Sequence, residues 1–233
     1  MIRRAIALAM TVPALGAAGA AGAACTSACA VSADQVAAAA ASAAITQDGR
    51  NNSAAITQSS GHNLSAITQR GNGNRASISQ SAASGSASID QRGGQHSAAV
   101  TQSGNGNQTA AITQSDLPGL GGGNVAVVSQ GGNSDNALRL YQLGAANSYQ
   151  GDQLAYAAGN RAIVAQTGAS NAIKLSQNGS NNDANLAQVG TSDALKVTQS
   201  GEDNRLNFLQ SGANLSYAVT QTGGAAATIV QTH

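Results

Sequence analysis

Residues 51–80 read NNSAAITQSSGHNLSAITQRGNGNRASISQ and contain the pattern from which the fold can be inferred. Three glutamines, Gln58, Gln69 and Gln80, lie eleven residues apart, and each is preceded six residues earlier by an asparagine. Similar segments at a fixed spacing are typical of proteins built from stacked structural repeats, so we infer the fold from this spacing first. Along the chain the glutamines recur at seventeen positions: 47, 58, 69, 80, 91, 102, 114, 130, 142, 153, 166, 177, 188, 199, 210, 221 and 231.

Each unit has its characteristic residues two positions apart, as in Asn52-x-Ala54-x-Ile56-x-Gln58. A period of two predicts a β-strand with these four residues on one face, and it excludes a helix. Four residues that usually include glycine separate each glutamine from the next asparagine, and glycine and asparagine tolerate a positive φ. We therefore predict a strand of about seven residues and a tight turn in each unit.

Short strands joined by four-residue arcs form either hairpins within one sheet or arches that send alternate strands into two sheets. The inward residues are small and uniform, which suits two flat sheets packed face to face. In arches, unit n stacks on unit n+2, so asparagine lies above asparagine and glutamine above glutamine, and amide ladders satisfy the buried side chains. The predicted fold class is therefore all-β: a repeat β-solenoid of stacked strand-turn-strand arches, with two facing parallel sheets in a cross-β arrangement.

The first thirty residues have the pattern of a secretory signal peptide, with Arg3 and Arg4 before an apolar, alanine-rich run. We place cleavage after Ala24 or after Ala30 and treat residues 1–30 as the signal. A transmembrane anchor is the alternative. Cys25 and Cys29 lie at this junction, where neither lipidation nor a metal or redox site is favoured by the flanking residues.

The mature chain divides into four parts. Residues 31–42 are an alanine-rich segment before the repeats, and residues 43–114 form a first block of repeats. Residues 115–123, SDLPGLGGG, lengthen one turn and include a proline, so we predict a surface loop. Residues 124–233 form a second block, in which the unit ending at Gln153 has Tyr149 and Gly151 in place of aliphatic residues and is expected to be weak.

Composition argues against an ordinary globule and against an enzyme. Only 39 of the 233 residues are Leu, Ile, Val or Phe, there is no Trp, and the net charge is +1. A near-neutral chain gives no electrostatic reason to expect nucleic acid as a partner. His62, His96 and His233 are scattered and expected at the surface, and no residues converge as a catalytic or metal site. We predict no enzymatic activity and no cofactor.

Units such as Ser65-x-Ile67-x-Gln69-x-Gly71-x-x-Asn74-x-Ala76-x-Ile78-x-Gln80 resemble the curlin repeat, in which these residues recur over about 22 positions as two strands. The resemblance covers residues 43–231. It implies a secreted subunit of curli, the extracellular functional amyloid of bacterial biofilms, with a role in matrix formation and surface adhesion. It does not distinguish the major subunit from the minor, nucleating one.

The resemblance also implies partners and sites. The partners are further copies of the chain or another curlin subunit, a curli-type secretion pore with periplasmic helpers, and host or abiotic surfaces. Amide residues that flank the strands would form the self-assembly ladder: Gln47, Asn52, Gln58, Asn63, Gln69, Asn74, Gln80, Gln166, Asn171, Gln177, Asn204, Gln210, Gln221 and Gln231.

An uncapped last strand offers unpaired N–H and C=O groups to another molecule. Seven charged residues are expected in turns or on outward strand positions, where they act as gatekeepers against premature pairing or as ordinary surface charges: Asp48, Arg50, Arg70, Arg75, Asp90, Arg92 and Asp152.

The alternative function is a soluble, monomeric β-solenoid that acts as an adhesin or an ice-binding protein. Its support is the row of outward residues before each glutamine, Thr46, Thr57, Thr68, Ser79, Thr101 and Thr113. That row decays in the second half of the sequence, where Tyr141, Asp152, Ala165, Ala187 and Leu209 take the position.

Overall fold

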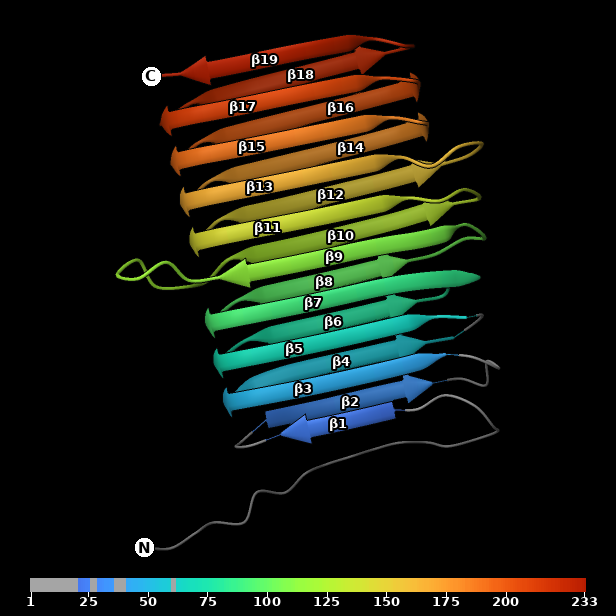
Figure 1. Ribbon diagram of the computed structural model, residues 1–233, viewed down its shortest axis with the longest axis vertical. Helices are drawn as coiled ribbons and strands as arrows, with labels where there is room; N and C mark the ends of the chain where they lie inside the picture. The colour runs from blue at the N-terminus through green and yellow to red at the C-terminus, as the bar shows by residue number, and fades with distance from the viewer. Residues whose placement is uncertain (1–20, 26–28, 36–40, 60–61) are drawn as a thin grey trace, which may run out of the picture.

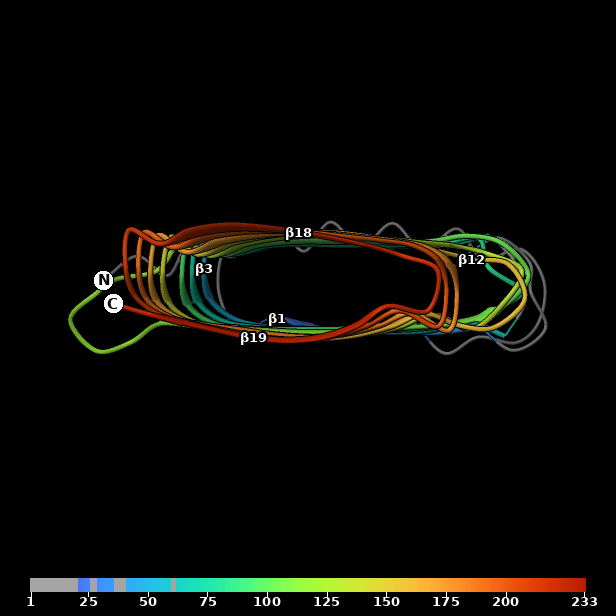
Figure 2. The ribbon, with the colours of Figure 1, turned by 90° about the horizontal axis from the view of Figure 1, so that it is seen from above.

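The computed structural model describes residues 21–25, 29–35, 41–59 and 62–233, and every regular element in that part of the chain is a β-strand. The strands alternate between two sheets and wind into one flattened solenoid of about nine turns (Figures 1 and 2). The predicted fold class is confirmed: two parallel sheets face each other and the chain passes between them at every arc.

Sheet A consists of the ten odd-numbered strands, in sequence order. They are β1 (Ala21–Cys25), β3 (Ser42–Arg50), β5 (Leu64–Asn72), β7 (Ser84–Gly94), β9 (Asn107–Ser115), β11 (Ala137–Ala145), β13 (Arg161–Ala169), β15 (Asp183–Thr191), β17 (Arg205–Ala213) and β19 (Ala226–Thr232).

Sheet B consists of the nine even-numbered strands, which run in the opposite direction behind sheet A in Figure 1. They are β2 (Cys29–Gln35), β4 (Asn52–Gln58), β6 (Arg75–Gln80), β8 (Ser97–Gln102), β10 (Val125–Gly132), β12 (Ser148–Ala155), β14 (Ala172–Ser180), β16 (Ala194–Glu202) and β18 (Ser216–Thr222).

Like residues stack on like residues, as the repeat predicts. In sheet A, Ile45 lies opposite Ile67 and Gln47 opposite Gln69, and the same register continues along the stack. Alternate residues of each strand point inward, so the core is a double row of alanine and larger aliphatic side chains between the sheets. A typical strand buries one small and one large apolar residue, such as Ala54 and Ile56, which are at most 2% exposed.

Most of the strands are longer than the seven residues predicted, because they continue into the arc, usually through the repeated glycine. β13, for example, has nine residues and includes Gly168. Gly168 has a φ of 118°, and a Cβ there would lie 1.9 Å from the carbonyl oxygen of Gly190 on the next turn. The turns therefore stack as closely as the strands, and backbone pairing extends into them.

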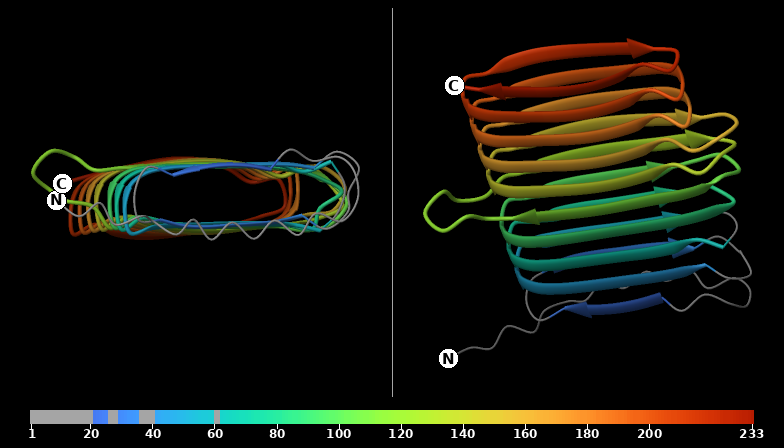
Figure 3. Two further views of the ribbon diagram at one scale, coloured as in Figure 1. Left: turned by 90° about the horizontal axis from the view of Figure 1, so that it is seen from below. Right: turned by 45° about the horizontal axis from the view of Figure 1, so that its top comes forward.

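Residues 115–123, which the sequence predicts to be a surface loop, interrupt the stack between β9 and β10. Ser115 is the last residue of β9, and the rest of the segment projects sideways from the solenoid (Figure 3) and contains an isolated bridge between Leu117 and Gly121. The strands on either side of it keep their places in the two sheets, so the insertion does not shift the register of the stack.

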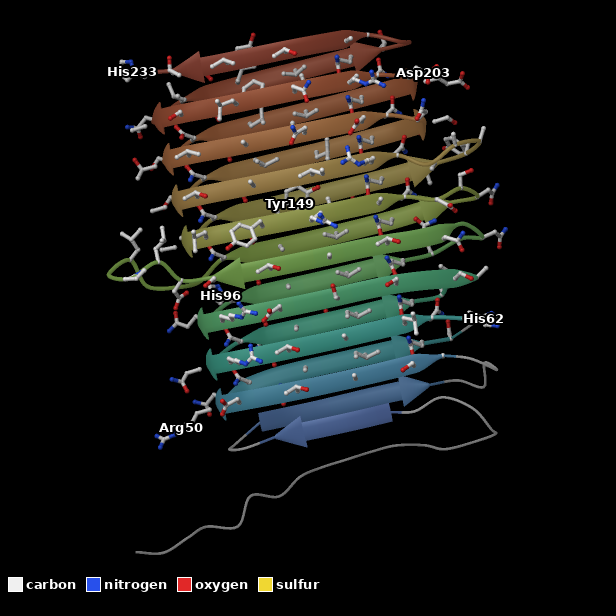
Figure 4. All side chains as sticks on the ribbon, in the orientation of Figure 1. Arg50, His62, His96, Tyr149, Asp203 and His233 are labelled. Atoms are coloured by element: carbon white, nitrogen blue, oxygen red, sulfur yellow. The ribbon has the colours of Figure 1, made fainter. Side chains whose placement is uncertain are left out.

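The expectation of a weak unit at Gln153 is wrong for its backbone pairing, because β12 pairs along its whole length with β10 and with β14. The two unusual residues compensate for each other. The Tyr149 ring points into the core (Figure 4), and a Cβ on Gly151 would lie 2.1 Å from its hydroxyl oxygen. The missing side chain at Gly151 thus makes room for the ring.

Two strands precede the predicted repeats. β1 lies within the predicted signal peptide and pairs with β3, and β2 overlaps the predicted segment before the repeats and pairs with β4. The signal peptide and its cleavage points stay predictions, and residues 1–20 lie outside the described residues. No helix in the described part of the chain is long and apolar enough to cross a membrane.

Candidate self-assembly interface

The repeated glutamines form one continuous column in each sheet. In sheet A, each Nε2 donates to the Oε1 of the glutamine on the next turn, at 2.6 to 3.0 Å. We call Gln47, Gln69, Gln91, Gln114, Gln142, Gln166, Gln188, Gln210 and Gln231 the sheet A column. In sheet B the same bond joins Gln58, Gln80, Gln102, Gln130, Gln153, Gln177, Gln199 and Gln221, the sheet B column, at 2.7 to 2.9 Å.

The second amide hydrogen of these glutamines crosses to the other sheet. Gln166 Nε2 in β13 donates to the carbonyl oxygen of Ser148 in β12, at 3.0 Å, and Gln199 Nε2 in β16 donates to that of Asp183 in β15, at 3.0 Å. A glutamine in the middle of a column therefore links neighbouring strands of its own sheet, and it also links the two sheets across the solenoid. All column members from Gln47 to Gln210 are at most 3% exposed, so a missing bond would leave a buried polar group unpaired.

The asparagines also stack, but their bonding differs from the amide-to-amide ladder that the sequence suggests. Asn52 Oδ1 accepts the backbone N–H of Asn74 at 3.0 Å, and Asn52 Nδ2 donates to the carbonyl oxygen of Gly71 at 2.8 Å. Most asparagines at these positions repeat one or both of these bonds. The asparagine side chains thus bond mainly to the arc of the next turn, where backbone groups are displaced from the regular ladder.

Some positions of the asparagine columns hold other residues. His96 occupies one of them with its side chain buried (Figure 4): its Nδ1 accepts the backbone N–H of Asn124 at 3.2 Å, and its Nε2 lies 2.8 Å from Asp116 Oδ1. The expectation that all three histidines lie at the surface is therefore wrong for His96, because an imidazole can replace the asparagine acceptor. His62 and His233 are exposed.

Asp193 is a second residue that occupies an asparagine column and was not predicted to do so. It is 1% exposed, and its Oδ1 accepts the N–H of Leu215 at 2.9 Å, whereas its Oδ2 has no hydrogen-bond partner. The signal was present in the spacing, since Asp193 precedes Gln199 by six residues, as each asparagine precedes its glutamine.

The predicted ladder residues fall into these two kinds of column. Gln47, Gln58, Gln69, Gln80, Gln166, Gln177, Gln210, Gln221 and Gln231 belong to the glutamine columns, and Asn52, Asn63, Asn74, Asn171 and Asn204 to the asparagine columns. The structure brings them together along one chain; their role between chains stays a proposal.

At the C-terminal end of the stack, β18 and β19 are the edge strands of the two sheets (Figure 1). No described residue pairs with their outer edges. Within β19 every residue is exposed or half-buried, and Val230 is 64% exposed. The last turn therefore offers unpaired backbone groups together with the ends of both glutamine columns.

The outward hydroxyl row separates by sheet. On sheet B it continues through the second block as Ser129, Ser176, Thr198 and Thr220, interrupted at Asp152. On sheet A the same position changes to Tyr141, Ala165, Ala187, Leu209 and Val230. The predicted decay of the row is thus confined to sheet A, apart from Asp152.

The charged residues are dispersed along the stack. Asp48, Arg50, Arg70, Arg75 and Arg92 lie within strands rather than in turns, because the strands extend into the arcs. Asp90 forms an ion pair with Arg92, and Arg161 Nη1 lies 3.0 Å from Asp183 Oδ1 on the outer face of sheet A. Among the described residues no group of three or more His, Cys, Asp or Glu side chains could hold a metal ion.

Comparison with known families identifies one repeat in this chain. The curlin associated repeat matches residues 40–67, 63–91 and 85–115, which correspond to the turns from β3 to β9. No curated protein matches the chain. The curlin repeat belongs to structural subunits and not to enzymes, and the matched residues contribute the amide columns described above. The three matches together span residues 40–115 of the 233, so this part of the chain carries three curlin associated repeats.

Proposed function

We propose that the chain is a secreted structural subunit that assembles into extracellular, curli-like amyloid fibres of a biofilm matrix. The observation that supports this proposal most directly is the C-terminal edge of the stack. β18 and β19 have unpaired outer edges among the described residues, and both glutamine columns reach this last turn. Another copy that adds its strands there extends the hydrogen bonding already present within the chain.

The proposal includes the partners and the location that are typical of the family. The chain assembles with copies of itself or with another curlin subunit, leaves the cell through a curli-type pore with periplasmic helpers, and contacts host or abiotic surfaces as a cell-surface fibre. A low net charge, +1 for the full chain and −1 without Arg3 and Arg4 of residues 1–30, favours such close packing, since copies stacked in register would otherwise repel one another.

Assembly is tested with the chain from residue 31 onward, diluted from denaturant and followed by thioflavin T fluorescence. We expect a lag followed by growth, and we expect preformed fibres to abolish the lag. A flat trace over days from a β-rich monomer would refute the proposal.

A matched pair of variants tests the role of the columns. Replacing Gln58 and Gln80 with leucine should slow fibre formation far more than replacing Arg50 and Arg70 with serine. The glutamines are buried in the sheet B column, and the arginines are exposed. Equal effects of the two double substitutions would count against column-directed assembly.

A second candidate function is binding of a surface or of ice by the soluble monomer. It is favoured by the hydroxyl row on sheet B, Thr57, Ser79, Thr101, Ser129, Ser176, Thr198 and Thr220, which one flat sheet presents at strand spacing. A stable monomer that shapes ice crystals or binds a surface without assembling would favour this function.

A further inference from the structure

The glutamine columns have a direction. In all the glutamine-to-glutamine bonds, eight in sheet A and seven in sheet B, the earlier turn supplies Nε2 and the later turn supplies Oε1. The columns therefore run from an acceptor at the N-terminal end to a donor at the C-terminal end. Two copies can continue a column head to tail, whereas two like ends would oppose donor to donor or acceptor to acceptor.

The two ends of the sheet A column are complementary. Gln47 Oε1 is buried and has no hydrogen-bond partner, and Gln231 Nε2 makes no hydrogen bond within the described part of the chain. Gln231 of one copy placed above Gln47 of the next would form the bond that every intervening pair makes. In that register, β19 of the first copy pairs with β3 of the second.

The asparagine columns do not continue across such a junction. On the last turn their positions are held by Leu215 and Ala225, whose backbone N–H groups bond to Asp193 and Asn204. On the first turn the position opposite Asn52 is Cys29. Among the amide columns, therefore, only those of glutamine reach both ends, and they set the register of the junction.

The outer edge of β3, however, is already paired in the complete chain. β1, residues 21–25, lies parallel to β3 with Cys25 opposite Gln47. By this register β1 has a cysteine, and not a glutamine, at the sequence position of the sheet A column. With β1 included, sheet A has ten strands and sheet B nine. The strand β1 is therefore a half-turn that precedes the nine complete turns from β2 to β19.

Both predicted cleavage points would remove β1 as a strand. Cleavage after Ala24 leaves only Cys25 of β1, and cleavage after Ala30 leaves none of it. Residues 31–35 of β2 remain, with Gln35 opposite Gln58. Each sheet would then have nine strands, β2 to β18 and β3 to β19, and a second copy would meet a complete turn on both sheets.

We propose that β1 occupies the edge of β3 on which β19 of a second copy docks, with Gln231 above Gln47, so that removal of β1 by signal cleavage opens this end of the subunit to growth. The inference rests on the proposed function, and it adds a direction, a register and a control step. An uncleaved copy still has a free C-terminal edge. It can join a fibre through β18 and β19, but it presents β1 to the next copy and stops growth at that end.

The first experiment measures growth of fibres formed by the chain from residue 31, seeded into solutions of the unprocessed chain, residues 1–233. We expect processed chain to elongate the seeds continuously. Unprocessed chain should add about one copy per seed, at the end that presents β3, and then stall, and a substoichiometric amount should stop elongation by processed chain at that end. Sustained elongation by the unprocessed chain would overturn the inference.

A pair of proline variants separates blocking by β1 from a general effect of the signal residues. Ala23→Pro in the unprocessed chain removes a backbone N–H from the middle of β1 and should restore sustained elongation. Ala18→Pro changes the same signal region outside β1 and should leave the stall unchanged. Identical behaviour of the two variants would contradict a role for β1.

Cross-linking in fibres of the processed chain tests the register. Thr46 and Val230 are the exposed residues that precede Gln47 and Gln231, so Thr46→Cys and Val230→Cys in one chain should be joined between copies by a short thiol cross-linker. Thr57→Cys with Val230→Cys is the control, because Thr57 lies on sheet B. Fibres that form but do not cross-link through residues 46 and 230 would refute this docking register, whereas absence of fibres would refute the proposed function itself.

Discussion

The two blocks of repeats share an interior and differ on the outside. In the first block, residues 43–114, the outward position before the glutamine of sheet A holds Thr46, Thr68, Asp90 and Thr113. In the second block, residues 124–233, it holds Tyr141, Ala165, Ala187, Leu209 and Val230. The glutamine columns pass through both blocks without a break.

The difference shows which positions the stack constrains. A residue inside the solenoid has a similar neighbour above and below, so a change leaves unpaired or poorly packed atoms on three turns. A residue on the outer face meets solvent and varies at little cost. The curlin repeat matches the first block, whereas the geometry of the same repeat extends through the second.

The largest effect is expected at the stacked arc glycines, which occur in both blocks. Gly71→Ala and Gly168→Ala should each lower the free energy of unfolding of the monomer by about 2–4 kcal/mol, since both need a positive φ and a Cβ would collide with the next turn. Gly119→Ala, in the loop with open space around it, should cost about 1 kcal/mol. Denaturant unfolding measures all three. A loss of stability for only one of Gly71→Ala and Gly168→Ala would contradict an interior shared by the two blocks.

Nearly as large an effect is expected in the sheet A column. Gln114→Leu in the first block and Gln166→Leu in the second should each cost about 2–3 kcal/mol. Each substitution leaves a buried donor on the turn before it and a buried acceptor on the turn after it unpaired. Thr113→Val, on the outer face beside Gln114, should change stability by less than about 0.5 kcal/mol. Comparable costs for Gln114→Leu and Thr113→Val would contradict the column model.

A medium effect is expected where the second block departs from the pattern. Gly151→Ala should destabilise by about 1–3 kcal/mol, because its Cβ would overlap the Tyr149 hydroxyl. Adding Tyr149→Leu should recover most of the loss, since the two substitutions together restore the aliphatic pattern of the other turns. A double-mutant cycle by thermal unfolding measures this coupling; strictly additive effects would show that the two residues do not share one space.

The same tyrosine illustrates the cost of a polar group in this core. Its hydroxyl has no hydrogen-bond partner, and burial, with a smaller contribution from Asp152, raises the pKa of Tyr149 far above its usual range. The phenol therefore stays neutral at every pH at which the protein is handled.

The smallest effect, a gain, is expected at Asp193 in the second block. Asp193→Asn should stabilise the monomer by about 1 kcal/mol, because the new Nδ2 can donate to the Gly212 carbonyl oxygen as Asn171 donates to that of Gly190. Asn171→Asp, the reverse change one turn earlier in the same column, should cost a similar amount in the same unfolding assay. Loss of stability on Asp193→Asn would show that the carboxylate is required at that position.

Most of the fold and of the glutamine columns could be predicted from the sequence, because both follow from one period. A period of two within units of eleven permits only stacked strands, and similar residues in every unit permit only in-register stacking. The asparagine bonds could not be predicted, since they reach backbone groups of the arc whose positions depend on where the strands end. His96 and Asp193 were missed because a residue type alone does not show that it occupies a column.

Spacing along the chain was sufficient to predict the number of repeat units, the inward residues and the glutamine columns, because each of these follows from the period. Only the structure shows that the alternation between the sheets continues past the loop at residues 115–123, and with it that the hydroxyl row survives on sheet B and is lost on sheet A. It also decided the pairing of β1 with β3, since backbone hydrogen bonds at a sheet edge form with any strand that lies in register, whatever its side chains.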